Sequence, residues 1–150
     1  MSRFVYLIIL LIFCSPLIAE DYCDKAYWDV ALVKEEEKCR NIAELGNDEA
    51  QFGYSLILIG GHDRISKPNE AFEWFTKSAK QGNHLAQTIL GRMLSDSHFG
   101  VSLDLPKAYA WWAVSNNTKS ANELWLRLTS DQQDKAKELE KEYASAYVRK

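Results

Sequence analysis

The sequence has few of the residues that usually carry enzymatic or metal chemistry. Its 150 residues include three histidines and three cysteines. His62, His84 and His98 are too widely separated for metal-ligand spacing, and His62 and His98 occur where loops are expected. There is no Gly–x–Ser–x–Gly motif and, after residue 19, no Ser–x–x–Lys pair; Gly60–Gly61 is typical of a turn. We therefore predict no enzymatic activity, no metal and no cofactor.

Long apolar runs and a strong charge of one sign are also scarce. The one unbroken apolar run, from Phe4 to Phe13, is about ten residues, whereas a membrane-spanning helix needs roughly twenty. After Ala19 the chain has 17 basic and 21 acidic residues, so its formal charge is −4. Weak acidity argues against binding to nucleic acid. We predict neither a nucleic-acid partner nor a stable membrane span.

The N-terminal residues have the layout of a secretory signal. Arg3 precedes the apolar run, Ser15–Pro16 interrupts it, and Ala19 offers a small residue at a cleavage position. A buried N-terminal helix is the alternative, but the run has no polar face. We expect residues 1–19 to be removed and the remaining chain to be periplasmic or secreted.

Two cysteines, Cys23 and Cys39, remain after this cleavage. In an exported chain such a pair favours a disulfide over two free thiols, the open alternative. On one continuous helix their Cα atoms would lie about 24 Å apart, but a disulfide requires less than about 7 Å. The chain should therefore turn back between Asp29 and Lys34, so that residues 20–34 form a stapled N-terminal segment. Such a bond contributes about 2–4 kcal/mol.

The sequence repeats itself at a period of 36 or 37 residues. Gly46–Gln51 returns as Gly82–Gln87, and Lys67–Trp74 returns as Asp104–Trp111. Strand signals are nearly absent; only Ser55–Ile59 is ambiguous, and the repeat register assigns it to a helix. A period in this range predicts stacked helical hairpins, because one hairpin cannot bury its apolar face alone.

Apolar spacing predicts individual helices. Helices are expected over Asn69–Lys80 and Asn83–Leu94, and Pro106 suits the first turn of a third. This third helix is expected to fade at residues 116–118, followed by a shorter apolar segment. Ser130 and Gln133 have the spacing of a capping box for a final, more polar helix.

These residues resemble the Sel1-like repeat family, which is related to the tetratricopeptide repeats. One full repeat is matched by Ala71, Trp74, Ala79, Gly82, Ala86, Gln87, Leu90 and Gly91. Ala108 and Trp111 begin another, and Ala43, Gly46, Ala50 and Gln51 end an earlier one. The resemblance implies an all-α fold: a short right-handed α-solenoid of hairpins over residues 35–128, with a C-terminal capping helix over residues 129–150. Because residues 116–118 are Asn–Asn–Thr, where the family has Ala and Gly, a third complete repeat is not assured.

The resemblance also implies a role in binding protein. Solenoids of this kind bind partners on a concave surface lined by the first helix of each hairpin. The residues expected there are Glu73, Lys77, Tyr109, Trp112 and Asn116. Core packing is expected for Trp74 and Trp111. For Trp112 and its register mate Phe75, packing between repeats and contact with a partner are alternatives.

The leading hypothesis is thus a non-enzymatic periplasmic module that binds an envelope protein. The main alternative is an immunity protein that neutralises a secreted, envelope-targeted antibacterial toxin such as a phospholipase, because small exported proteins of this kind resemble such antidotes. A neighbouring toxin gene would favour the second. A hydrolase using the groove between helices is a third, weaker hypothesis.

Overall fold

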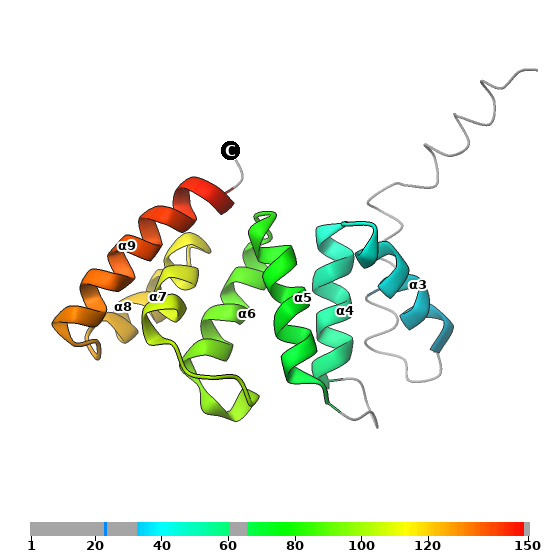
Figure 1. Cartoon of the computed structure of the whole chain (residues 1–150), viewed down its shortest axis with the longest axis horizontal. Helices are drawn as coiled ribbons and strands as arrows, with labels where there is room; N and C mark the ends of the chain where they lie inside the picture. Colours follow the sequence, from blue (N-terminus) through cyan, green and yellow to red (C-terminus); the bar gives the residue numbers. More distant parts are fainter. Residues whose placement is uncertain (1–22, 24–32, 61–65, 149–150) are drawn as a thin grey trace, which may run out of the picture.

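The computed structural model describes residues 23, 33–60 and 66–148 of the chain. The predicted signal, the predicted turn before Lys34 and His62 lie outside these residues. The described part contains seven α-helices and one short 3₁₀ helix (Figure 1). They are α3 (Val33–Glu44), α4 (Asp48–Gly60), α5 (Pro68–Lys80), α6 (His84–Ser95), η1 (Ser97–Phe99), α7 (Leu105–Val114), α8 (Thr118–Trp125) and α9 (Ser130–Tyr147). Residues 55–59 are helical, as the repeat register predicts.

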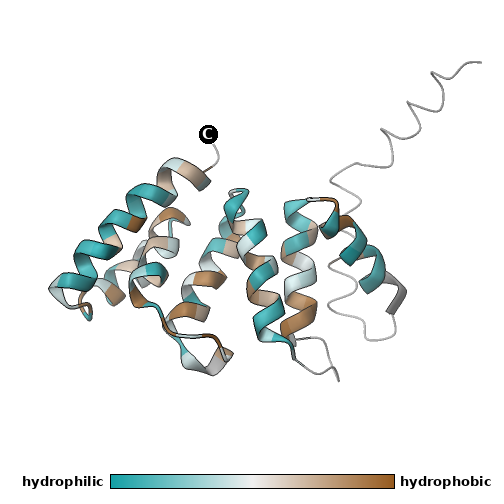
Figure 2. Ribbon diagram, in the orientation of Figure 1, coloured by the Kyte–Doolittle hydropathy of each residue, from teal (hydrophilic) through white to brown (hydrophobic). Residues whose placement is uncertain are grey.

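The helices form a row in which each packs mainly on its neighbours in sequence. The principal contacts follow the order α3–α4–α5–α6–α7–α8, and α9 returns to pack on α7 (Figure 1). Hydropathy differs between and along the helices: α9 is mostly hydrophilic, whereas α4 changes from hydrophilic at its start to hydrophobic at its end (Figure 2). The prediction of an all-α stack of hairpins with a terminal helix is confirmed.

A left-handed residue followed by an asparagine joins the two helices of each hairpin. Gly46 and Gly82 have φ of 96° and 90°, a conformation that glycine adopts without steric cost. The next residue, Asn47 or Asn83, caps the second helix: Asn47 Oδ1 accepts from Ala50 N at 2.7 Å, and Asn83 Oδ1 accepts from two backbone N–H groups at 3.1 Å. This explains why Gly–Asn recurs in the sequence.

The third hairpin is complete, although its second helix was not assured from the sequence. Asn116 takes the place of glycine with φ of 62°, which asparagine tolerates better than most residues with a side chain. Asn117 then accepts a hydrogen bond from Ser120 N at 3.4 Å and begins α8. The break expected at residues 116–118 is therefore the turn of the hairpin.

In the first two hairpins an Ala–Gln pair joins the two helices. Gln51 Nε2 donates to Ala43 O, and Gln87 Nε2 donates to Ala79 O, each at 3.1 Å. These acceptors lie in the last turns of α3 and α5, where carbonyl groups have no partner within the helix. Both glutamines are buried, so the bonds also satisfy their amide groups.

Small residues at helix crossings and aromatic rings between them fill the core. Alanines such as Ala71, Ala79 and Ala108 are completely buried, which lets adjacent helices approach closely. Phe75 is also completely buried and lies 5.8 Å from the Phe52 ring centroid. Phe75 is thus a core residue and is unavailable to a partner.

The capping box of the terminal helix α9 starts one residue earlier than the sequence predicts. Thr129, and not Ser130, is the N-cap: its Oγ1 accepts from Gln132 N, and Gln132 Oε1 accepts from Thr129 N. Gln133, the predicted partner, instead donates to the carbonyls of Trp125 and Leu128. The prediction of Ser130–Gln133 was wrong because two overlapping pairs have the same spacing.

A disulfide joins Cys23 to Cys39, with their Cα atoms 5.2 Å apart. Both side chains are buried. The bond packs against Gly53 of α4, where an added Cβ would collide with Cys23. The cysteine pair therefore fixes residue 23 to the first hairpin, as the predicted staple requires.

Candidate interaction surfaces

One exposed surface is formed by the first helices α3 and α5, and we call it the first-helix face. On α5 it presents Glu73 and Lys77, both exposed. Trp74 is half-buried beside them; its ring is 3.6 Å from Lys77 Nζ and meets Tyr54 edge to face at 5.6 Å. On α3 the face presents Arg40 paired with Glu44 at 2.9 Å, along with other exposed polar residues. A tryptophan bearing a cation, within polar surroundings, is typical of protein interfaces.

The corresponding face of α7 is covered by α9. Ala110, which is 37 residues after Glu73, is completely buried. The Trp111 ring packs at a tilt against that of Tyr143 of α9, with ring centroids 4.4 Å apart. Burial raises the pKa of the Tyr143 phenol to about 12. The first-helix face therefore ends at α5.

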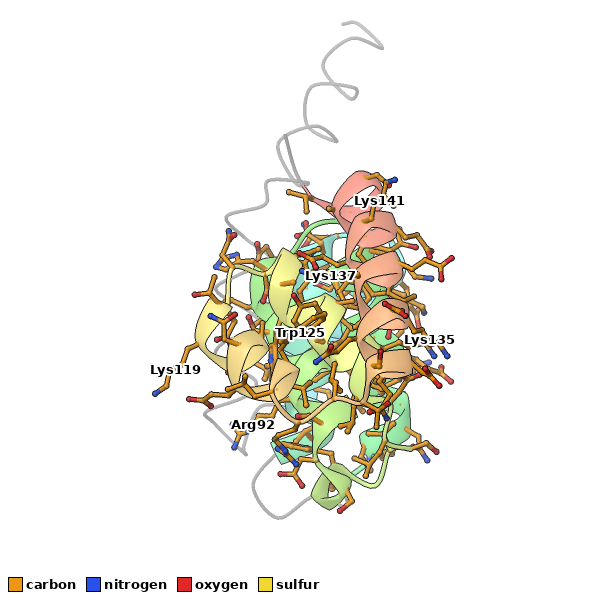
Figure 3. All side chains as sticks on the ribbon, turned by 90° about the vertical axis from the view of Figure 1, so that its left-hand side faces the viewer. Arg92, Lys119, Trp125, Lys135, Lys137 and Lys141 are labelled. Carbon is orange, nitrogen blue, oxygen red and sulfur yellow. A yellow bond between two sulfur atoms is a disulfide. The ribbon has the colours of Figure 1, made fainter. Side chains whose placement is uncertain are left out.

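Tyr109 lies under the same helix and contacts Lys137. The Lys137 Nζ donates to the Tyr109 hydroxyl at 2.8 Å and pairs with Glu140 at 2.7 Å. The hydrogen bond to Glu140, followed by that to Tyr109, raises the pKa of the Lys137 ammonium. Lys137 also lies 5.2 Å from the Trp125 ring (Figure 3). Only 7% of Tyr109 is exposed, so it holds α9 in place and offers little surface to a partner.

The five predicted contact residues are thus distributed over different places. Glu73 and Lys77 lie together on the first-helix face, Tyr109 is buried beneath α9, and Asn116 is exposed in the hairpin turn. Trp112 points away toward α6, where its Nε1 donates to Thr88 O at 3.0 Å. Their shared location on first helices does not bring these residues onto one surface, because residues close together on α7 face different helices.

Trp112 forms part of a polar groove between α6 and α8, and we call this the α6–α8 groove. Its volume is about 540 Å³. Helix α6 contributes Thr88, Arg92 and Ser95, and the segment of α8 contributes Asn117, Ser120 and Arg127. Arg92 and Lys119 lie on the side of the molecule opposite Lys135 and Lys141 of α9 (Figure 3). The sequence did not predict this groove, because the contact residues were expected on first helices and the groove is lined mainly by second helices.

The groove has an excess of hydrogen-bond donors. Neither Arg92 nor Arg127 has an ion pair among the described residues; Arg92 lies 5.6 Å from the Phe99 ring centroid. Asn117 uses its Oδ1 as a helix cap, which leaves its amide –NH₂ able to donate. Asp96 lies at one end, where it already makes an interaction.

The described residues hold no group of three or more histidine, cysteine or acidic side chains placed to bind a metal. His84 is exposed at the start of α6. Within the same part of the chain, none of the helices combines the length and the apolar character required to cross a bilayer.

The repeat units align with a known family model. Residues 48–83 and 84–113 each match the Sel1 repeat. Over these residues the chain is similar to Sel1 repeat proteins. Each matched Sel1 unit runs from the second helix of one hairpin through the first helix of the next, that is, α4–α5 and α6–α7. Trp112 and Gly91 both lie in the second Sel1 unit, whereas α8 and α9 lie beyond it.

A solved structure supports the same fold. The chain is similar to c5321, a protective antigen present in uropathogenic Escherichia coli strains and described as displaying an SLR fold, with a TM-score of 0.71 and 29% identity. The match covers 77% of this chain but 26% of that one, so this chain corresponds to about a quarter of the antigen's length. No curated protein matches the chain.

Proposed function

We propose that the chain is an exported, non-catalytic Sel1 repeat module that binds another protein through its first-helix face. The observation that carries this proposal is the uncovered face of α3 and α5, next to a covered α7. Trp74 provides a large aromatic surface there, and Glu73 and Lys77 provide charges of both signs. Half-buried tryptophans surrounded by polar groups often supply much of the binding energy at interfaces.

Two observations support export to the periplasm or beyond. The Cys23–Cys39 disulfide would be stable in an oxidising compartment. The similar chain c5321 is a protective antigen, and a location outside the cytoplasm would suit such a protein. Both agree with the secretory signal expected over residues 1–19.

Site-specific photo-crosslinking in the native host tests the proposal. A photoreactive amino acid at Lys77 should give one discrete crosslinked species in the envelope fraction. The matched control is the same amino acid at Lys135, an exposed lysine of α9 that lies outside both the first-helix face and the groove side of the molecule (Figure 3). Equal, diffuse crosslinking from both positions would contradict the proposed face.

The captured protein also distinguishes the two forms of the function. An envelope component would identify an adaptor, and a secreted toxin would identify an immunity protein. In either case Trp74→Ala should reduce the crosslinked species at least tenfold, because loss of a central interface tryptophan commonly costs about 2 kcal/mol or more. Circular dichroism of the variant checks that the fold is retained.

A further inference from the structure

We propose that the α6–α8 groove is a second binding site, and that it takes an acidic peptide segment of a protein. It is separate from the first-helix face and is formed mainly by second helices. Arg92 approaches from α6 and Arg127 from the end of α8, so two guanidinium groups from different hairpins border one hollow of about 540 Å³. A volume of this size can hold a few peptide residues.

Charge complementarity determines the class of ligand. Guanidinium groups bind carboxylates through paired N–H donors, and such charge-assisted bonds are stronger than neutral ones. Arg40, in contrast, already pairs with Glu44, whereas Arg92 and Arg127 have no ion pair in the described part of the chain. The two groove arginines are therefore available to an external carboxylate.

Uncharged donors extend the site between the arginines. The hydroxyls of Thr88 and Ser120 line the groove with the Asn117 amide, whereas the Ser95 hydroxyl already donates to Arg92 O at 3.0 Å. Hydroxyl and amide groups can bind the backbone carbonyls of a peptide that lies across α6 and α8. The Trp112 ring adds an apolar wall, and its Nε1–H is already satisfied by Thr88 O. This mixture of aromatic and polar groups suits a peptide segment.

The acidic groups nearby favour peptide carboxylates over phosphate. Asp96 lines one end of the groove. Glu123 lines a smaller hollow of about 110 Å³ that shares Trp112, Ser120 and Arg127 with the groove. Both would repel a compact dianion more strongly than a single carboxylate held between the arginines. An extended segment can place its carboxylates near Arg92 and Arg127 and neutral atoms near Asp96 and Glu123.

Fluorescence anisotropy with a defined peptide pool tests this site. The probe is a fluorescein-labelled nonapeptide pool with Glu–Asp–Glu at its centre and uncharged random flanks; the matched pool has Gln–Asn–Gln. The protein is the disulfide-bonded chain, as wild type, Arg92→Gln, Arg127→Gln and the double variant. The control variant is Lys119→Gln, which removes the same charge from an exposed position that does not line the groove.

The acidic pool should bind at least tenfold more tightly than the amide pool. Each arginine substitution should weaken binding about tenfold, the effect expected for loss of one charge-assisted contact, whereas Lys119→Gln should change it less than twofold. Arg127→Lys should recover only part of the affinity, because lysine lacks the planar pair of donors. Thermal unfolding of each variant distinguishes loss of the site from loss of the fold.

Three results would overturn the assignment. One is equal binding of the two pools, or wild-type binding by the double variant. Another is calorimetric binding of inorganic phosphate that requires both arginines while the acidic pool does not bind. The third is self-association in light scattering that both arginine substitutions abolish, which would make the occupant a second copy of the chain. The outcome is independent of the crosslinking at Lys77, which probes the first-helix face.

Discussion

The Trp112 ring lies directly on Gly91, so that a Cβ added to Gly91 would be 2.5 Å from Trp112 Cδ1 and Nε1. Gly91 is the glycine of the Leu–Gly pair in its Sel1 repeat, and the close contact explains why that position carries no side chain. The same contact orients Trp112 toward Thr88 and forms the wall of the α6–α8 groove. A packing feature of the repeat thereby shapes a candidate binding site.

Gly91→Ala should destabilise the protein by about 1–3 kcal/mol, because the added methyl group overlaps the indole in a packed region. Urea unfolding followed by circular dichroism measures the change. The variant Trp112→Leu should remove the clash. Gly91→Ala should therefore lower the free energy of unfolding less in a Trp112→Leu background than in the wild type. Equal costs in the two backgrounds would show that the ring does not restrict residue 91.

Gln87→Leu should reduce the free energy of unfolding by about 1–3 kcal/mol, because it removes two hydrogen bonds by which a buried amide links α6 to α5 and α9. The Gln87 amide donates to Ala79 O and also to Tyr147 O of α9, each at 3.1 Å. Asn122→Leu is the control, since it also replaces an amide by leucine in a second helix, α8, but at an exposed position. Chemical denaturation of both variants measures the difference. Similar losses would mean that the hydrogen bonds of Gln87 contribute little.

The sequence predicts the helices well where its repeat is regular. The expected Asn69–Lys80 and Asn83–Leu94 agree with α5 and α6 to within one residue. The Gly82–Asn83 turn that separates them can be recognised directly in the sequence. The third hairpin was harder to predict, because Asn116 replaces the glycine. Only the backbone conformation of Asn116, with its positive φ, shows that it makes the same turn.

The candidate surfaces were less predictable than the helices. Local spacing indicates that α9 has an apolar side but not that this side covers α7, which buries Tyr109. Likewise the α6–α8 groove depends on two arginines 35 residues apart, whose meeting follows from the stacking of hairpins. Periodicity reports which residues share a helix face, and it does not report which helix lies opposite.

Asn116→Gly should leave stability unchanged or raise it by up to about 1 kcal/mol, because glycine adopts a positive φ more readily. Asn116→Val should lower it by about 1–2 kcal/mol, since a β-branched residue is strained in the left-handed region. Thermal unfolding of the two variants provides the comparison. Asn116 is exposed, so lost packing would not confuse the result. A valine variant as stable as wild type would contradict the turn conformation.

Removing the disulfide should lower the free energy of unfolding by about 2–4 kcal/mol, as expected for a closed loop of this size. The variant is Cys23→Ser with Cys39→Ser, compared with wild type under oxidising and reducing conditions. Reduction should destabilise the wild type and leave the double variant unaffected. Because the bond lies at the first hairpin, the binding of the acidic pool by the distant α6–α8 groove should persist in the folded variant. An unchanged unfolding midpoint on reduction would show that the staple adds no stability.

Stability should fall as pH rises above 10, in part through Tyr143. Its pKa is raised to about 12 in the folded protein, whereas an unperturbed tyrosine has a pKa near 10. Between these values the unfolded chain loses the phenolic proton and the folded chain keeps it, so unfolding becomes more favourable. Below pH 10 both states hold the proton and this contribution is constant.

Tyr143→Phe isolates that contribution, since it keeps a ring against Trp111 and removes the ionisable hydroxyl. Urea unfolding at pH 8, 9, 10 and 11 should show the wild type losing more stability than the variant between pH 10 and 11. The remaining tyrosines and lysines titrate in both proteins and cancel in the difference. Absorbance at 295 nm, which detects tyrosinate, adds a direct readout. Tyr143 should be among the last tyrosines to ionise in the folded wild type, so the two proteins should differ only at the highest pH values. Parallel stability curves across the four pH values would mean that packing of α9 on α7 does not shield the Tyr143 hydroxyl from water.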